Sequence, residues 1–230
     1  MLKIKKIYQF ILDLILPKKC VICFVEGAWV CKKCQRKIVK IETPFCPECK
    51  KITSNGHYCK RCRKNYELTG IISAVHYDKI LKKIIYAYKY DGVRTLAGPL
   101  SQLVIQRLNG NFPRGKIILT AIPLHFFRQN ERGFNQSEII AQNVAKAFDL
   151  PCYKLLKRKI NTKSQIDFAA AKRKKNVVGA FEFIPQSVKV QNKTILLLDD
   201  VATTGTTLNE AAKVLKKAGA KSVWGLTIAK

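Results

Sequence analysis

The amino-acid sequence predicts an α/β fold, in which helices flank a parallel sheet, with a small cysteine-rich module before it. Short apolar runs alternate with helical patterns from residue 67 onward, as expected for parallel strands that are buried on both faces. Four Cys-x-x-Cys pairs precede that region. These two observations divide the 230 residues into a helix over 1–17, a cysteine module over 18–66 and an α/β domain over 67–230.

The first segment is predicted to form an amphipathic helix over residues 4–16, which ends at Pro17. Its basic start and short apolar stretch resemble a signal peptide, but Asp13 interrupts the stretch and no small-residue cleavage site follows. The stretch is also too short to cross a membrane. We expect the helix to pack on its own protein, with association at a membrane surface as the alternative. We expect a cytoplasmic protein without a transmembrane segment.

The cysteine pairs predict two structural zinc sites. Each Cys-x-x-Cys pair can supply two thiolates, and two pairs complete a tetrahedral four-sulfur site. This spacing is typical of zinc in a reducing compartment rather than of disulfides. Short spacers favour the joining of consecutive pairs, although spacing alone leaves an interleaved arrangement open. The predicted ligands are Cys20, Cys23, Cys31 and Cys34 for one ion, and Cys46, Cys49, Cys59 and Cys62 for the other.

The charge of the chain is unusual, because 43 Lys and Arg stand against 15 Asp and Glu, a formal net charge of +28. Such a field is typical of proteins that bind nucleic acid, anionic membranes or polyphosphates. Since the lysines recur along the whole chain, a general lysine richness of solvated surfaces is the alternative. Many of the cations surround the cysteine pairs, which makes single-stranded DNA an expected partner.

The α/β domain begins with a predicted strand over 69–78. A helical pattern over 79–90 ends at Asp91-Gly92, and a second covers 96–108. The next buried strand covers 116–122, and a helix follows from about residue 137 to 148. The remaining strands predicted to complete the sheet cover 181–184, 195–198 and 222–229.

The stretch from Thr194 to Leu208, TILLLDDVATTGTTL, carries the most chemistry. A buried strand ends at Asp199 and Asp200, a run of small and hydroxylated residues follows, and a helix then continues to Gly219. Ligands of open α/β sheets bind at the carboxyl ends of strands, and a helix N-terminus favours phosphate. The pattern therefore indicates a site for a phosphorylated sugar. The alternative is an ordinary turn in which an Asp and a Thr cap the helix.

Two further segments carry candidate anion-binding residues. The strand that ends at Ile122 leads into a predicted loop with Arg128, Arg132 and Gly133, and guanidinium groups bind phosphate oxygens in a bidentate manner. Residues 156–183 have few apolar side chains and several cations, as expected for a long loop with a short helix that acts as a lid. Surface arginines and a solvated charged hairpin are the respective alternatives.

The Thr194 to Leu208 stretch resembles the phosphoribosyl pyrophosphate (PRPP) motif of type I phosphoribosyltransferases. The pattern RxxxRGFNQ beside Pro123-Leu124-His125 is similar to the ComF family of competence-associated, phosphoribosyltransferase-like proteins. The resemblance spans almost the whole chain, with the cysteine module and an RxxxTxxQ pattern from Arg158 in the same order. It implies a type I phosphoribosyltransferase-like fold with a double zinc ribbon. It also implies a role in handling DNA that enters naturally competent bacteria, alongside other proteins of the competence machinery.

The resemblance further implies that PRPP binds with Mg²⁺, which bridges the pyrophosphate and the ribose hydroxyls with support from the two aspartates. The loop arginines would hold the pyrophosphate, and the segment after residue 156 would close over it. The residues implied to bind PRPP are Asp199, Asp200, Thr203, Thr204, Gly205, Thr206, Thr207, Pro123, Leu124, Arg128, Arg132, Arg158, Lys163 and Arg173.

One departure from this pattern concerns catalysis. Purine-salvage relatives often carry an Asp just before the central Thr-Gly pair, as a base for the nucleobase, and Thr203 stands at that position. The sequence therefore predicts a PRPP site without a purine-directed base, and names neither a catalytic residue nor an acceptor. Phosphoribosyl transfer and non-catalytic binding both remain open. A non-catalytic accessory protein for single-stranded DNA, which uses the basic surface and the zinc ribbon, is the alternative function.

Overall fold

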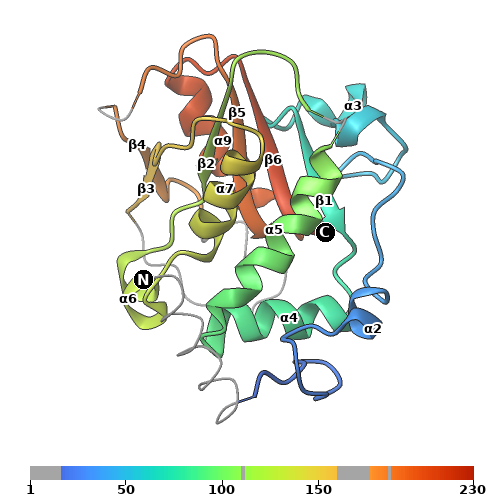
Figure 1. The fold of residues 1–230 in the computed structure, drawn as a ribbon. Helices are drawn as coiled ribbons and strands as arrows, with labels where there is room; N and C mark the ends of the chain where they lie inside the picture. Colours follow the sequence, from blue (N-terminus) through green and yellow to red (C-terminus); the bar gives the residue numbers. More distant parts are fainter. Residues whose placement is uncertain (1–16, 110–111, 160–176, 186–187) are drawn as a thin grey trace.

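A computed structural model describes residues 17–109, 112–159, 177–185 and 188–230. Its centre is a four-stranded parallel sheet in the order β1-β6-β5-β2 (Figure 1). The strands are β1 (Gly70–Val75), β2 (Ile117–Ala121), β5 (Thr194–Val201) and β6 (Ser222–Ala229). Most of their residues are buried, because helices cover both faces of the sheet, and this burial explains the unbroken apolar runs. The predicted parallel sheet is confirmed.

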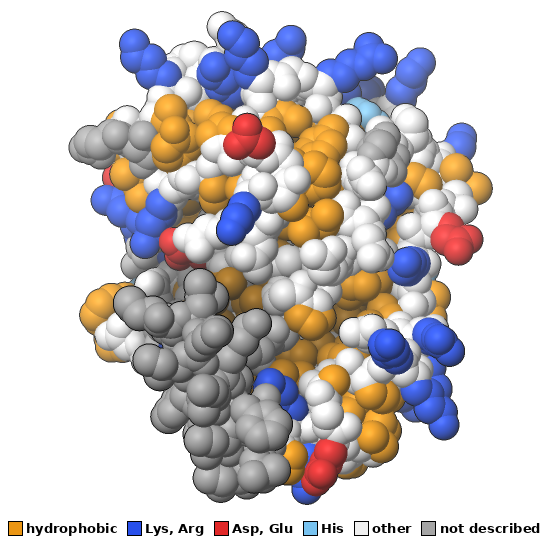
Figure 2. All heavy atoms as spheres, in the orientation of Figure 1, with side chains coloured by type: hydrophobic (Ala, Val, Ile, Leu, Met, Phe, Trp, Pro, Cys, Tyr) orange, Lys and Arg blue, Asp and Glu red, His pale blue; other side chains and the backbone are white. Residues whose placement is uncertain are grey.

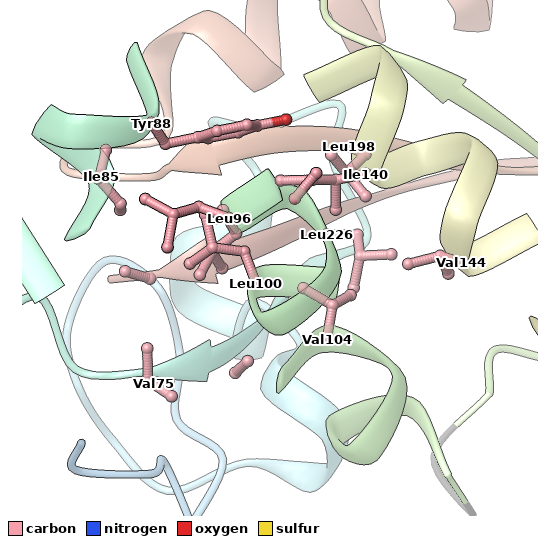
Figure 3. Packing of buried hydrophobic residues seen from close by; sticks show 14 of the residues in the cluster. Val75, Ile85, Tyr88, Leu96, Leu100, Val104, Ile140, Val144, Leu198 and Leu226 are labelled. Atoms are coloured by element: carbon pink, nitrogen blue, oxygen red, sulfur yellow. The ribbon is translucent and has the colours of Figure 1, made fainter. Parts of the chain in front are cut away.

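Helices α4 (Lys79–Tyr90), α5 (Ala97–Leu108) and α7 (Gln136–Ala147) cover one face of the sheet. A short 3-10 turn, η2 (Arg94–Leu96), joins the first two. Figure 3 shows how Tyr88, Leu100 and Ile140 from these helices meet Leu198 and Leu226 from the strands. Helix α9 (Thr206–Lys217) packs on the opposite face. The predicted bounds of these helices, α9 included, agree with the structure to within two residues.

Two short strands, β3 (Leu156–Arg158) and β4 (Phe181–Phe183), pair antiparallel in a separate sheet. The prediction that 181–184 completes the main sheet is therefore wrong. The outer edge of β2 is instead occupied by residues 151–153, since Leu119 N–H donates to Pro151 O at 2.8 Å and Tyr153 N–H donates to Leu119 O at 3.0 Å. An apolar run reveals that a strand is buried but not which edge it joins.

The cysteine module contains the helical turns α2 (Lys32–Gln35), η1 (Ser54–Gly56) and α3 (Lys60–Arg63). Its first half joins the core on the α4, α5 and α7 face through Cys20, Val30 and Cys34. Its second half joins the core beside α9 through Tyr58 and Cys62. Both halves thus share their buried cores with the α/β domain.

The predicted N-terminal helix lies outside the described residues, apart from Pro17. Within the described part of the chain, no helix combines the length and the apolar character needed to cross a membrane.

Candidate functional site

A cavity of about 390 Å³ opens where β5 and β2 end and α9 begins. This is the edge at which open parallel sheets bind their ligands. It brings together most of the residues that the sequence singled out, from segments far apart in the chain. The predicted residues that line it are Leu124, Arg128, Arg132, Arg158, Asp199, Asp200, Thr203, Thr204, Gly205, Thr206 and Thr207.

Three predicted residues stand apart from this cavity. Pro123 is buried and lines a separate cavity of about 50 Å³ on the other side of the loop. Lys163 and Arg173 lie outside the described residues.

The loop between β5 and α9, residues 202–205, forms the floor of the cavity with the first turn of α9, and we call it the phosphate loop. It ends at Gly205, the N-cap residue of α9, whose φ of 73° is left-handed and strained for other residues. No side chain caps this helix at that position. Thr204 Oγ1 and Thr206 Oγ1 lie 2.8 Å apart. The N-terminus of a 12-residue helix and two hydroxyl groups therefore face the cavity, an arrangement suited to an anion.

The two aspartates lie above this loop and do not cap the helix. Asp199 Oδ1 accepts the N–H of Asp200 at 2.9 Å, and Asp200 Oδ1 accepts the N–H of Val201 at 2.6 Å. Ser137 Oγ donates to Asp199 Oδ1 at 3.4 Å. Their remaining acceptor capacity faces the cavity, where neighbouring hydroxyl groups of a sugar could donate to it.

Lys89 on α4 forms an ion pair with Asp200 through Nζ and Oδ2. Burial and the charge of Asp200 raise the pKa of Asp199 to about 7, against the opposing effect of Lys89. Burial alone would lower the pKa of Lys89, but its contact with Asp200 outweighs burial and raises it. At neutral pH the lysine stays charged, and it compensates one of the two carboxylates.

Arg128, Arg132 and Arg158 line the cavity. The first two lie on a short helix, α6 (Phe126–Arg132), in the segment after β2 that was predicted to be a loop. The expectation of a continuous loop is therefore wrong there. The His125 imidazole caps it by accepting the N–H of Phe127 at 3.4 Å, and Gly133 ends it with φ 70°. The sequence pattern did not predict this helix or the role of His125 as the residue that caps its N-terminus.

Arg132 at the end of α6 is held in place by three contacts. Its guanidinium lies over the Tyr90 ring, 4.7 Å from the centroid, and Nη2 donates to Tyr90 Oη at 3.0 Å. Nη1 donates to Gln136 Oε1 at 3.2 Å. Such contacts fix the orientation of the planar fork before an anion binds.

Arg158 was predicted to belong to a long loop but lies on β3, paired with Phe181 of β4. Burial and the charge of Arg128 lower its pKa to about 10, so it remains a cation at neutral pH. Repulsion between cations that converge on one cavity is relieved when an anion binds between them.

Sequence reasoning missed several cavity residues, among them Lys89, Tyr90, Gln136 and Ser137. A signal existed for Lys89, because it follows the buried Ile85 by four residues and so lies on the inner face of α4. A lysine on the buried stripe of a helix indicates a buried anionic partner. The tyrosine, glutamine and serine carry no comparable signal, since each is common on helix surfaces.

The eight paired cysteines form two clusters, which confirms the consecutive arrangement. In each, the four sulfur atoms lie within 4.8 Å of one another. The distances between the sulfurs of Cys23 and Cys31, 3.6 Å, and of Cys49 and Cys59, 3.7 Å, match the edge of about 3.8 Å in a tetrahedron with Zn–S bonds of about 2.3 Å. All nine cysteines, Cys152 included, are free of disulfides.

The electrostatics of the first cluster also fit a dication. Burial opposes ionisation of Cys20, but N–H groups that include those of Cys31 and Cys23 lower its pKa to about 6. Burial and the neighbouring sulfurs raise the pKa of Cys34 to about 12. Several thiolates can be charged together only when a cation lies among them, so the residues present fit two structural zinc ions.

Sheet, cavity and cysteine clusters together define a protein of the phosphoribosyltransferase fold with two zinc ribbons. Two family models match the chain, a double zinc ribbon domain over residues 11–63 and a phosphoribosyl transferase domain over residues 92–229. Competence protein F of Haemophilus influenzae is 30% identical over 208 residues, which are 86% of this chain and 89% of that protein. Competence protein ComFC of Bacillus subtilis is 28% identical, over 86% of this chain and 83% of that protein. The chain belongs to the ComF family of phosphoribosyltransferase-like proteins.

Among solved structures, phosphoribosylpyrophosphate synthetase from Mycobacterium smegmatis is 17% identical with a TM-score of 0.33. The match covers 54% of this chain and 33% of that one, so the chain spans about a third of the synthetase.

Proposed function

We propose that this protein binds PRPP in the cavity between the phosphate loop, the aspartate pair and the three arginines. One observation carries the proposal: the cavity joins a helix N-terminus whose N-cap residue is a glycine, two adjacent carboxylates and several guanidinium groups. The helix N-terminus suits the sugar phosphate, the carboxylates suit vicinal ribose hydroxyls, and the arginines suit the pyrophosphate. Few ligands other than a pyrophosphorylated sugar need all three.

Mg²⁺ is the metal that we propose to accompany PRPP. When bound, it would neutralise pyrophosphate oxygens and polarise the bond that breaks in a transfer reaction. Asp199 and Asp200 offer the hard oxygen atoms that Mg²⁺ and its water ligands prefer. The ion pair between Lys89 and Asp200 places a cation at this position, so we expect the lysine to shift or to share the carboxylate when Mg²⁺–PRPP binds.

The cavity offers little support for purine chemistry. Among its described lining residues, Asp199 and Asp200 are the acidic side chains, and both are engaged with backbone groups and Lys89. Thr203, at the position of the purine-directed base, has no group that takes a proton near neutral pH. If phosphoribosyl transfer occurs, we expect an acceptor that needs no carboxylate base, and the arginines would stabilise the departing pyrophosphate.

Calorimetric titration with Mg²⁺–PRPP tests the proposal. We expect the unmodified protein to bind and the Asp199→Asn, Asp200→Asn double variant to lose binding while it keeps its fold and zinc. Asp149→Asn is a matched control, because Asp149 is exposed and has φ 51°, a conformation that asparagine tolerates well. Unchanged affinity of the double variant for Mg²⁺–PRPP, or no binding by the unmodified protein, would contradict the proposal.

We further propose a role in natural competence, supported by the names of the two competence proteins to which the chain is similar. Single-stranded DNA is the proposed macromolecular ligand, and proteins of the competence machinery are proposed partners. The cations of the ribbon turns support the DNA proposal, because all are exposed: Lys32, Lys33, Lys60, Arg61 and Arg63. In Figure 2, Lys and Arg side chains stand along the upper edge of the molecule and outnumber Asp and Glu. We also propose a cytoplasmic location, where thiolate zinc sites persist.

Fluorescence anisotropy with a labelled oligonucleotide tests the DNA proposal. We expect affinity to fall steeply with salt, because each neutralised phosphate adds roughly 0.7 to the slope of log K against log salt. The Lys32→Ala, Lys33→Ala, Lys60→Ala, Arg61→Ala variant should reduce that slope by the same roughly 0.7 for every phosphate that it no longer neutralises. A Lys146→Ala, Lys154→Ala, Lys217→Ala, Lys221→Ala variant, which removes the same number of exposed cations outside the ribbons, serves as the control. Equal slopes for both variants would remove the ribbon from the proposal.

A further inference from the structure

The second zinc ribbon reaches the phosphate loop from the side that faces away from the cavity, through Tyr58. This residue is 4% exposed, and its ring stacks on Tyr66 with a centroid distance of 4.1 Å. Tyr58 is absent from the residues that line the cavity. A Cβ atom placed on Gly205 would lie 3.3 Å from Tyr58 Oη, so the hydroxyl stands directly against the backbone of the loop.

The Tyr58 hydroxyl is buried and has no hydrogen-bond partner among the described residues. Its neighbour in the stack differs, because Tyr66 Oη donates to Glu48 at 2.6 Å. A buried hydroxyl without a partner costs free energy, and a phenylalanine of the same shape would avoid that cost. The unpaired hydroxyl of Tyr58 is therefore explained if it forms a hydrogen bond in another state of the protein.

Further contacts tie the segment that directly follows the ribbon to the same turn of α9. Asn209 Oδ1 accepts the N–H groups of Glu67 and Leu68 at 2.9 and 3.4 Å, and Asn209 N–H donates to Gly205 O at 2.9 Å. Tyr58 N–H donates to Thr69 O at 3.2 Å, just before β1. The ring of Tyr58 thus has a fixed place beneath the loop.

We propose that Tyr58 is a positioning residue for PRPP, an inference that rests on the proposed function. When a phosphate binds at the loop, peptide N–H groups turn toward it, and the carbonyl groups of the same planar peptides turn away. The Tyr58 hydroxyl lies next to Gly205 on the side that faces away from the cavity. In the PRPP-bound loop it donates a hydrogen bond to one of these carbonyl groups. The bound form of the loop gains a hydrogen bond that the free form lacks, and the second zinc ribbon becomes part of the PRPP site.

Comparison of Tyr58→Phe with the unmodified protein by calorimetry tests this inference, with Tyr66→Phe as the control from the same stack. We expect Tyr58→Phe to weaken Mg²⁺–PRPP binding about fivefold, the effect of one neutral hydrogen bond. Its zinc content should stay at two ions per chain, and its unfolding temperature without ligand should equal or exceed that of the unmodified protein. Tyr66→Phe should keep its affinity for PRPP.

Unchanged PRPP affinity in Tyr58→Phe would overturn the inference, and a lower unfolding temperature beside it would show that the hydroxyl has a structural role instead. Failure of the unmodified protein to bind PRPP would instead overturn the proposed function and this inference with it. A second measurement is fluorotyrosine labelling followed by ¹⁹F NMR, in which the Tyr58 resonance is assigned by its absence from Tyr58→Phe and should shift in the unmodified protein on addition of Mg²⁺–PRPP. A Tyr58 resonance that PRPP leaves in place would contradict the proposed hydrogen bond.

Discussion

Two carboxylates side by side in a partly buried position repel each other, and the structure around Asp199 and Asp200 shows how that repulsion is limited. Lys89 compensates Asp200, backbone N–H groups bind both side chains, and the pKa of Asp199 rises to about 7. The aspartate pair together with Lys89 is therefore close to neutral before a ligand binds. A dication bound with PRPP would allow both carboxylates to ionise.

This arrangement predicts a pH-dependent stability effect for Asp199→Asn. The folded-state pKa of about 7 lies above the unfolded value of about 3.9, so the stability contributed by the protonated form is complete below about pH 4 and lost as pH rises through about 7. Asparagine cannot ionise and escapes this loss. We expect the stability of the variant relative to the unmodified protein to be about 2 kcal/mol higher at pH 8 than at pH 5.5, or roughly 4 to 8 °C in unfolding temperature.

Thermal unfolding followed by circular dichroism at the two pH values measures this effect. The difference between variant and unmodified protein is the relevant quantity, because protonation of other groups cancels in it. A difference that is the same at pH 5.5 and pH 8 would mean that Asp199 ionises normally in the folded protein.

Gly205 is the second residue whose environment makes a sharp prediction. Its φ is 73°, and an added Cβ would lie 2.9 Å from Ile71 Cδ1. We expect Gly205→Ala to lose about 1 to 2 kcal/mol of unfolding free energy and to weaken PRPP binding, since alanine is strained at this φ and either the loop or the Ile71 side chain must shift. Gly92 has a similar φ of 68°, but a Cβ atom added there would meet no atom within 4 Å. Gly92→Ala therefore measures the cost of backbone strain without a steric clash.

Chemical denaturation measures the first effect and calorimetry the second. Gly92→Ala should share part of the stability loss and keep PRPP affinity. If Gly205→Ala binds PRPP as well as Gly92→Ala does, the phosphate loop does not require the observed backbone.

At the scale of elements, the sequence predicts long periodic segments well and short ones poorly. Helix α4 occupies the predicted residues 79–90, because its apolar stripe and its end at Asp91-Gly92 are both local signals. Helix α6 has seven residues and none of them is buried, so its sequence lacks an apolar stripe. The pairing of β3 with β4 depends on contacts between residues far apart in the chain, which local patterns do not encode.

The same distinction applies to the site. The phosphate loop and the aspartates lie within one continuous motif and are predictable from it. Tyr90 and Gln136 come from two other helices, and their roles arise from contacts with Arg132 that only the fold creates.

The two ribbons differ in what they touch, and this difference predicts unequal effects of zinc loss. Cys23 and Cys49 are both exposed ligands, one in each cluster. We expect Cys23→Ala and Cys49→Ala each to lose one zinc ion per chain and to lower the unfolding temperature. Only Cys49→Ala should also weaken PRPP binding, because its cluster supports Tyr58 and the phosphate loop.

Zinc release by a colorimetric chelator and PRPP titration, both at a temperature where each variant is folded by circular dichroism, give the comparison. Equal PRPP affinities in the two variants would show that the second ribbon and the site act independently.

At the scale of the whole molecule, the zinc ribbons and the sheet form a continuous body rather than separate modules. Buried residues of the ribbons belong to the same clusters as the strands and helices on both faces of the sheet. The sequence predicts three parts because its composition changes abruptly near residue 66, whereas burial reports what packs together in space. Removal of the zinc ions should therefore destabilise the α/β domain as well as the ribbons.

The central claim is that PRPP occupies the cavity at the carboxyl ends of the strands, and a crystal structure of the protein grown with Mg²⁺ and PRPP tests it most directly. We expect the sugar phosphate at residues 203–207, the ribose hydroxyls at Asp199 and Asp200, and the pyrophosphate beside Arg128 and Arg132. An empty cavity at saturating PRPP, or PRPP bound elsewhere on the basic surface, would contradict the account.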